Sequence, residues 1–135
     1  MRTTTWIAIV VLLVGAVSAI YYSLRRNNDW VVGGLYALPD EDGRYGVAKI
    51  LVLDRHAVHI RVYKEKFPSP PQEVNEHNLT LGSIHDTDGF GIGHLPLSRA
   101  SFRGSKPIFL RQSTVSEAEL DGYREWKDAN GGVWK

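Results

Sequence analysis

Short apolar runs separated by turn residues dominate the chain after residue 30, and this pattern predicts a β-rich domain. The clearest run covers residues 57–63, where Val58, Ile60 and Val62 alternate with His59, Arg61 and Tyr63. Such alternation is typical of a strand with one buried face and one face in water. The other predicted strands cover residues 31–38, 45–53, 79–84, 90–97 and 106–111.

One helix is predicted near the C-terminus. Ser116 and Glu119 have the spacing of a capping box, and the helical pattern continues to Gly131 and Gly132, which favour a stop. Three apolar side chains fall near one side and should pack on the sheet: Leu120, Tyr123 and Trp126. The apolar residues after this helix, Val133 and Trp134, are expected to fold back and plug one end of the sheet.

Two segments are predicted to be irregular. Three prolines in residues 67–78 favour an extended surface loop, and Asp88-Gly89 favours a hairpin turn between the fourth and fifth strands. Gly89, Gly91 and Gly93 alternate along the next strand, so a neighbouring backbone or an aromatic ring is expected to lie close to that face.

The N-terminal part reads differently, because residues 6–24 carry no charge. A helix of this length spans about 28 Å, close to the thickness of a bilayer core. Aromatic residues end the run and Arg2, Arg25 and Arg26 flank it, as at membrane interfaces. The prediction is a membrane anchor with basic flanks over residues 1–26, with residues 6–24 in contact with lipid, and a β-rich soluble domain over residues 27–135. A cleaved signal peptide is the alternative, since residues 17–19 resemble a cleavage site.

The flanking charges predict the orientation of this anchor. One Arg precedes the segment and two follow it, which favours a cytoplasmic position for the domain of a single-pass protein in the cell membrane. Counting the terminal amine makes the flanks equal, so an external domain remains open.

Composition narrows the function classes. Three of the 16 basic residues flank the apolar segment, so 13 basic residues face 15 acidic ones in the domain, and this balance does not favour a nucleic-acid partner. The absence of Cys excludes a disulfide framework and a thiolate nucleophile. The fold class expected is therefore α+β: one transmembrane helix followed by an antiparallel, partly closed sheet with one C-terminal helix.

The histidine spacing does not predict a metal site, because no H-E-x-x-H or H-x-H pair is present. His56 and His59 should leave their strand on opposite faces. The densest polar group, formed by His85, Asp86, Asp88 and His94, could supply an acid and a base to a substrate. Without Cys or a G-x-S-x-G nucleophile motif, no catalytic residue and no cofactor is assigned.

Charged residues interleaved with aromatic ones on the third strand favour a protein partner steered by charge. The candidate partner-binding residues combine this strand with the polar group, and they are His59, Arg61, Tyr63, Lys64, Lys66, His85, Asp86, Asp88 and His94.

The stretch GLYALP at residues 34–39, followed by DGRYGVAKIL at residues 42–51, resembles the opening of bacterial immunity protein 26-type domains. Those domains begin with a strand ending in proline, an acidic-glycine turn and a tyrosine-glycine strand. The resemblance covers about twenty residues and implies a small β-rich domain that binds and neutralises a toxin. The expected anchor departs from the usual soluble form, and no toxin-contacting residue can be carried over.

The function expected from the sequence is non-catalytic protein binding at a membrane, with an immunity (antitoxin-like) protein as its most concrete form. Two alternatives remain. One is a small hydrolase or sugar-binding enzyme that uses the His85–His94 region, and the other is an accessory subunit of a membrane complex.

Overall fold

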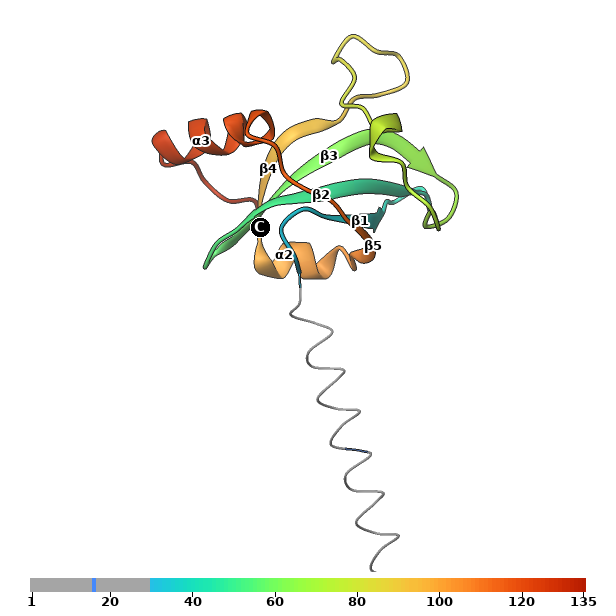
Figure 1. Cartoon of the computed structure of the whole chain (residues 1–135), viewed down its shortest axis with the longest axis horizontal. Coiled ribbons are helices and arrows are strands. Elements are labelled where there is room, and N and C mark those ends of the chain that lie inside the picture. Colours follow the sequence, from blue (N-terminus) through green and yellow to red (C-terminus); the bar gives the residue numbers. More distant parts are fainter. Residues whose placement is uncertain (1–15, 17–29) are drawn as a thin grey trace, which may run out of the picture. The chain divides into compact units, whose positions relative to one another are not determined.

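A computed structural model describes residue 16 and residues 30–135 of the chain. The chain divides into two units, Met1–Trp30 and Val31–Lys135. The second unit is built on five antiparallel strands in the order β4-β3-β2-β1-β5 (Figure 1). The strands are β1 (Gly34–Pro39), β2 (Tyr45–Leu53), β3 (Ala57–Phe67), β4 (Ile92–Ser98) and β5 (Ile108–Gln112).

The described sheet is open, so the prediction of a partly closed sheet is wrong. β4 pairs with β3 at one edge and β5 pairs with β1 at the other, and the two edges do not meet. Closure requires hydrogen bonding between the first and last strands of the order, and β5 contributes only five residues at its edge.

The prediction of a single-pass membrane anchor is also corrected. Among the described residues, no helix has both the length and the apolar character needed to cross a bilayer, which contradicts the predicted transmembrane helix and the membrane localisation. Apart from Ala16, residues 6–24, on which that prediction and its lipid contact rested, lie outside the described residues.

Residues 79–84, predicted as a strand, form none. Asp86 N–H donates to Ser83 C=O over 2.9 Å, and Gly82 has a φ of +61°, so the chain turns where a strand would continue. Single hydrogen bonds replace a ladder: Lys64 N–H donates to Thr80 C=O (2.9 Å) and Gly91 N–H to Leu81 C=O (2.6 Å). The predicted hairpin is therefore an irregular loop.

The alternating glycines explain part of this packing. A Cβ built at Gly91 would lie 2.3 Å from Val62 C=O, so close backbone approach requires a glycine there, as predicted. At Gly93 the nearest neighbour is Leu81 rather than an aromatic ring.

Helices lie on opposite sides of the sheet (Figure 1). On one side α2 (Arg99–Gly104), a helix that the sequence analysis missed, begins where the Ser98 hydroxyl accepts a hydrogen bond from Ser101 N–H (3.0 Å). Its Phe102 is fully buried and meets Tyr36 edge to face, with ring centroids 5.9 Å apart.

On the other side lies α3 (Asp121–Asp128), preceded by the 3-10 turn η2 (Ala118–Leu120). One of the two hydrogen bonds of the predicted capping box forms, because Glu119 accepts from Ser116 N–H (2.8 Å). The Ser116 hydroxyl does not cap an amide and donates to the same carboxylate. A 3-10 turn η1 (Glu76–Asn78) ends the predicted 67–78 loop on the same side.

The C-terminal segment does not plug the sheet. Trp134 is 67% exposed and forms a parallel bridge with the outer edge of β4. Its N–H donates to Pro96 C=O (2.9 Å), and Ser98 N–H donates to its C=O (2.7 Å). Pro96 has no N–H to offer, which suits a position on an edge strand.

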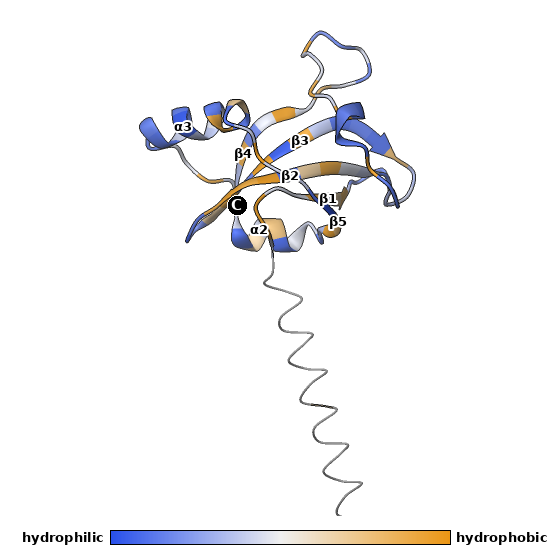
Figure 2. Ribbon diagram, in the orientation of Figure 1, coloured by the Kyte–Doolittle hydropathy of each residue, from blue (hydrophilic) through white to orange (hydrophobic). Residues whose placement is uncertain are grey.

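Apolar residues concentrate on β1 to β3 and on part of α2, whereas α3 is largely hydrophilic (Figure 2). A cluster on the α3 side of the sheet contains Leu35, Val47, Tyr63 and Val74. The core is therefore divided between the two faces, with Phe102 filling the face under α2.

Replacing Phe102 by Ala should destabilise the domain by about 3–5 kcal/mol, because the substitution leaves a cavity beside Tyr36. Denaturant unfolding followed by circular dichroism measures this loss. The matched control is Phe109→Ala, since Phe109 also meets Tyr36 edge to face but is 53% exposed. Equal losses for both variants would contradict the assignment of Phe102 to the core.

Candidate functional site

The nine predicted partner-binding residues do not form one patch. β3 carries His59, Arg61, Tyr63, Lys64 and Lys66, β4 carries His94, and His85, Asp86 and Asp88 lie in the loop between these strands. Their contacts divide them into three clusters around Lys49, His59 and Lys64. Lys66 belongs to none of them and pairs with Asp40 at 3.3 Å.

The first cluster surrounds Lys49, a residue that the sequence analysis did not single out. Its side chain is only 2% exposed, in the middle of β2. The ammonium donates to Glu76 Oε1 (2.5 Å) and to both oxygens of Glu119 (2.9 and 3.1 Å). A lysine inside the apolar run GVAKILVL was the available signal, since a buried cation requires carboxylate partners.

Further polar groups complete the Lys49 cluster. Tyr63 and Ser113 donate their hydroxyl protons to Glu76, and Arg61 lies 3.8 Å from Glu119. Burial, followed by the charge of Glu76, raises the pKa of Tyr63 well above its ordinary value, so the phenol stays protonated. No buried side-chain nitrogen or oxygen of the described residues lacks a partner, so this cluster offers no unpaired group to a ligand.

The carboxylates of the Lys49 cluster remain charged at neutral pH. Burial alone would raise the pKa of Glu76, but hydrogen bonds from Lys49 and Ser113 outweigh burial and lower it. The pKa of Glu119 is likewise lowered, because hydrogen bonds from Ser116 N–H and Lys49 outweigh burial. The cluster is thus an ion-pair network that ties η1 and η2 to the sheet.

The second cluster is a chain of three side chains, Asp54, His59 and His94. His59 Nε2 lies 2.7 Å from Asp54 Oδ2, and His59 Nδ1 lies 2.9 Å from His94 Nε2. The two imidazole planes differ by only 8°, so the rings are nearly parallel. His59 is fully buried, and the rings of Tyr123 and Trp126 from α3 meet it edge to face.

Contacts among these three side chains shift the pKa values of Asp54 and His94. Burial alone would raise the pKa of Asp54, but the hydrogen bonds from His59 and from the N–H groups of His56 and Ala57 lower it. The pKa of His94 is lowered by burial and then by the charge of His59. His94 is therefore neutral at pH 7.

Both histidines were selected from the sequence, but Asp54 was not. Asp54 lies between the predicted strands 45–53 and 57–63, and the pattern could not show that β4 lies beside β3 with Leu95 opposite Ile60. His94 contacts His59, Tyr123 and Trp126, whereas Asp86 and Asp88 contact Lys64. The His85–His94 set considered for an enzyme is thus divided between two clusters.

The third cluster holds the loop after Gly82. Lys64 donates to Asp86 Oδ2 (3.0 Å) and to Asp88 Oδ1 (2.9 Å), and Ser83 N–H donates to the same Asp86 oxygen (2.9 Å). Gly82 and Gly89 have positive φ values of +61° and +98°, which suit turns at the two ends of the loop. In Figure 1 this loop projects beyond the body of the sheet.

The same loop exposes large apolar side chains. Ile84 is 72% exposed and Phe90 54%, and Ile92 at the start of β4 is 40% exposed. We refer to Ile84, Phe90 and Ile92 as the loop patch. The sequence analysis placed Ile84, Phe90 and Ile92 in strands, and therefore did not predict an exposed apolar surface.

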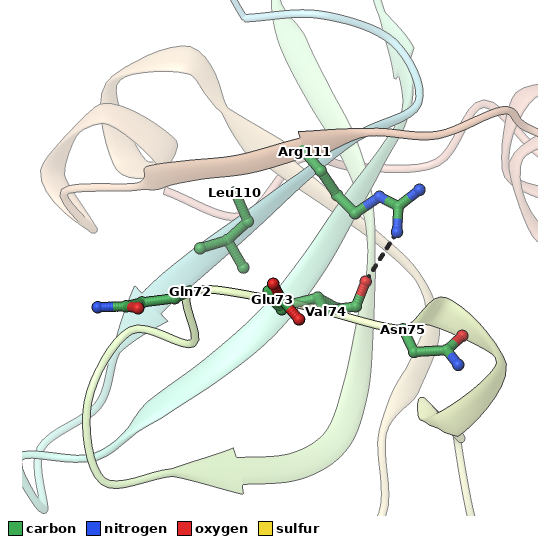
Figure 3. Close-up of a pocket in the computed structure, with 6 residues that line it drawn as sticks. All are labelled: Gln72, Glu73, Val74, Asn75, Leu110 and Arg111. Atoms are coloured by element: carbon green, nitrogen blue, oxygen red, sulfur yellow. Dashed lines mark hydrogen bonds between the residues drawn. The ribbon is translucent and has the colours of Figure 1, made fainter.

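A pocket of about 590 Å³ lies between β5 and the end of the 67–78 loop (Figure 3). A hydrogen bond from Arg111 Nη1 to Val74 C=O (2.9 Å) connects the two segments that line this pocket. The residues that line it are Gln72, Glu73, Val74, Asn75, Leu110 and Arg111. Arg111 thereby ties the loop to the edge strand.

Within the part of the chain that is described, no three His, Asp or Glu side chains come together as a possible metal site. Comparison with protein-family models, curated proteins and solved structures finds no match to this chain.

Replacing Lys49 by Met should cost about 3–5 kcal/mol of stability, because two buried carboxylates lose their cation. The difference in unfolding free energy between the wild type and the Lys49→Met protein should become smaller at low pH. The lowered pKa values of Glu76 and Glu119 stabilise the wild type above their ordinary value of 4.5, and this gain disappears as pH falls through their values in the folded state. Urea unfolding at pH 7 and pH 4 measures both effects.

The control for this prediction is Lys64→Met. Lys64 also pairs with two carboxylates, but Asp88 is 71% exposed, so the shift in urea midpoint should be much smaller. A Lys49→Met protein as stable as the Lys64→Met protein at pH 7 would show that the buried ion pairs do not stabilise the fold.

Proposed function

We propose that this domain is a non-catalytic protein-binding module that docks its partner on the loop patch. The observation that carries the proposal is the exposure of Ile84 and Phe90 on a loop that projects from the sheet, together with Ile92 where this loop enters β4. Exposed apolar groups at a projecting position are typical of interaction sites.

The polar surroundings of the loop patch support this proposal. Lys64, His85, Asp86 and Asp88, all selected from the sequence as partner-binding candidates, belong to the same loop or to its base. Protein interfaces commonly place apolar anchors in the centre and charged groups at the rim. Here the rim offers both signs of charge, which favours a protein over a polyanion.

The internal bonds of the loop add a second argument. Asp86 accepts from Lys64 and from Ser83 N–H, and the turn closes through Asp86 N–H and Ser83 C=O. A loop fixed before binding loses less conformational entropy when the partner docks. The Lys64 cluster thus serves to present Ile84 and Phe90 in one arrangement.

An immunity (antitoxin-like) protein is the concrete form of this proposal. A small β-rich domain with a preorganised binding loop suits neutralisation of a toxin by direct contact, and the β1–β2 hairpin carries the residues of the resemblance. The enzyme alternative is less well supported. In the described residues, no hydroxyl group hydrogen-bonds to His59 or His94, so neither imidazole is paired with a nucleophile.

The test is site-specific crosslinking in cells of the source organism. A photoreactive amino acid at Ile84 should give one predominant crosslinked protein, which is then purified and its affinity for the full chain measured by calorimetry. Replacing Ile84 and Phe90 by Ser should weaken that affinity by about 30-fold or more, as expected for hot-spot residues.

The matched control is Ile108→Ser with Phe109→Ser on β5. These residues are 42% and 53% exposed, but they lie on the opposite edge strand, and the affinity should stay within about twofold of the wild type. Equal losses from the β5 pair and the loop pair, or an unchanged affinity of the loop variant, would refute the docking site.

A further inference from the structure

α3 rests on the imidazole pair rather than on an ordinary apolar patch. The ring of Trp126 lies 4.5 Å from His59 and 6.1 Å from His94, and the ring of Tyr123 lies 4.8 and 6.2 Å from them, measured between centroids. No residue of α3 is itself buried. The attachment of this helix to the sheet therefore depends on the state of two titratable rings.

The two hydrogen bonds of the Asp54–His59–His94 chain determine which nitrogen donates and which accepts. Asp54 is a carboxylate and can only accept, so His59 Nε2–H donates to it. When each ring carries one proton, His59 has a lone pair on Nδ1, which accepts from His94 Nε2–H. The remaining nitrogen, His94 Nδ1, is left as a hydrogen-bond acceptor.

The pair can take up one proton but not two. Two imidazolium rings would each carry an N–H at the shared contact, where the nitrogens are 2.9 Å apart and both hydrogens would clash. When one proton enters at His94 Nδ1, the hydrogen bond between His94 Nε2 and His59 Nδ1 is kept. The added charge then lies on the imidazole pair, beneath Tyr123 and Trp126 of α3.

We propose that the Asp54–His59–His94 chain is a proton-controlled latch for α3, in which one proton taken up at His94 Nδ1 places a charge beneath Tyr123 and Trp126 and loosens the helix from the sheet. The latch is independent of the loop patch proposed above for partner docking.

The position of His94 explains why α3 responds. A Cβ built at Gly122, in the first turn of α3, would lie 2.7 Å from His94 Cβ and 3.9 Å from His94 Nδ1. The backbone of α3 at Gly122 therefore lies directly on the His94 side chain. A charge on this partly buried imidazole is poorly hydrated while Tyr123 and Trp126 cover it, and release of α3 returns it to water.

The other charged groups around the pair do not replace this effect. From α3, Tyr123 packs on both rings and the first turn carries Asp121. From α2, Arg99 donates to the carbonyl of Asp54 (3.2 Å). On β3 Arg61 is directed to Gly93 C=O (3.4 Å) and to Glu119 of η2 (3.8 Å). Asp54, at the β2–β3 turn, is thus the carboxylate bonded to the rings among the described residues.

The direction of the pKa shift agrees with this geometry. The pKa of His94 is lowered in the folded state, so the unfolded or released state binds the proton more readily. The stability of the closed state is therefore complete above the ordinary histidine value of 6.5 and falls as pH drops below it.

The experiment follows the full chain labelled with 5-fluorotryptophan by ¹⁹F NMR between pH 8 and pH 4.5. The Trp126 resonance should move toward the value of an exposed indole as pH falls below the ordinary histidine value of 6.5, and the resonance of exposed Trp134 serves as an internal reference. Amide exchange of α3, corrected for the intrinsic pH effect, should become faster over the same pH range.

The matched variants are His94→Gln and His85→Gln. The His94→Gln side chain keeps an amide N–H for His59 but cannot titrate, so the Trp126 shift should disappear, whereas His85→Gln in the exposed loop should leave it unchanged. Histidine ring ¹⁵N shifts of the wild type give a measurement that does not depend on a variant. The latch is refuted if His59 and His94 take up two protons over this range, or if Trp126 keeps its resonance throughout.

Discussion

The described fold depends on one buried contact, the ammonium of Lys49 held between Glu76 and Glu119. β2 is the central strand, and a cation there must be neutralised before the α3 side of the sheet can be covered. The two carboxylates come from η1 and η2, which are far apart in sequence. The contact therefore determines where the long loop after β3 and the segment before α3 return to the sheet.

The second consequence of this contact is specificity. An apolar side chain in place of Lys49 would accept many neighbours, whereas an ammonium with two carboxylates accepts few arrangements. The position of Glu119 also fixes the start of η2, so the register of α3 over His59 and His94 follows from it. The Lys49 cluster thus positions the helix, and the imidazole pair forms the surface on which that helix rests.

The local pattern predicted much of the fold and little of the site. The strand at 45–53 was predicted with its observed bounds, and the strand from 57 was predicted but continues to Phe67, because charged residues 64–66 stay extended when they pair with loop groups. The sheet edges, α2 and the irregular 79–91 loop depend on contacts between distant segments, which periodicity does not contain. Lys49 and Asp54 were missed for that reason, because Lys49 lies inside the predicted strand 45–53 and Asp54 lies between two predicted strands.

The bridge between Trp134 and β4 has a consequence for sequence variation. The tail is held by two main-chain hydrogen bonds, and its side chain remains exposed, so the identity of the residue at 134 contributes little to the attachment. The spacing contributes much more, because adding one residue between the end of α3 and this bridge would exchange the main-chain groups that face β4. We therefore expect residues 129–133 to tolerate substitution more readily than a change in length.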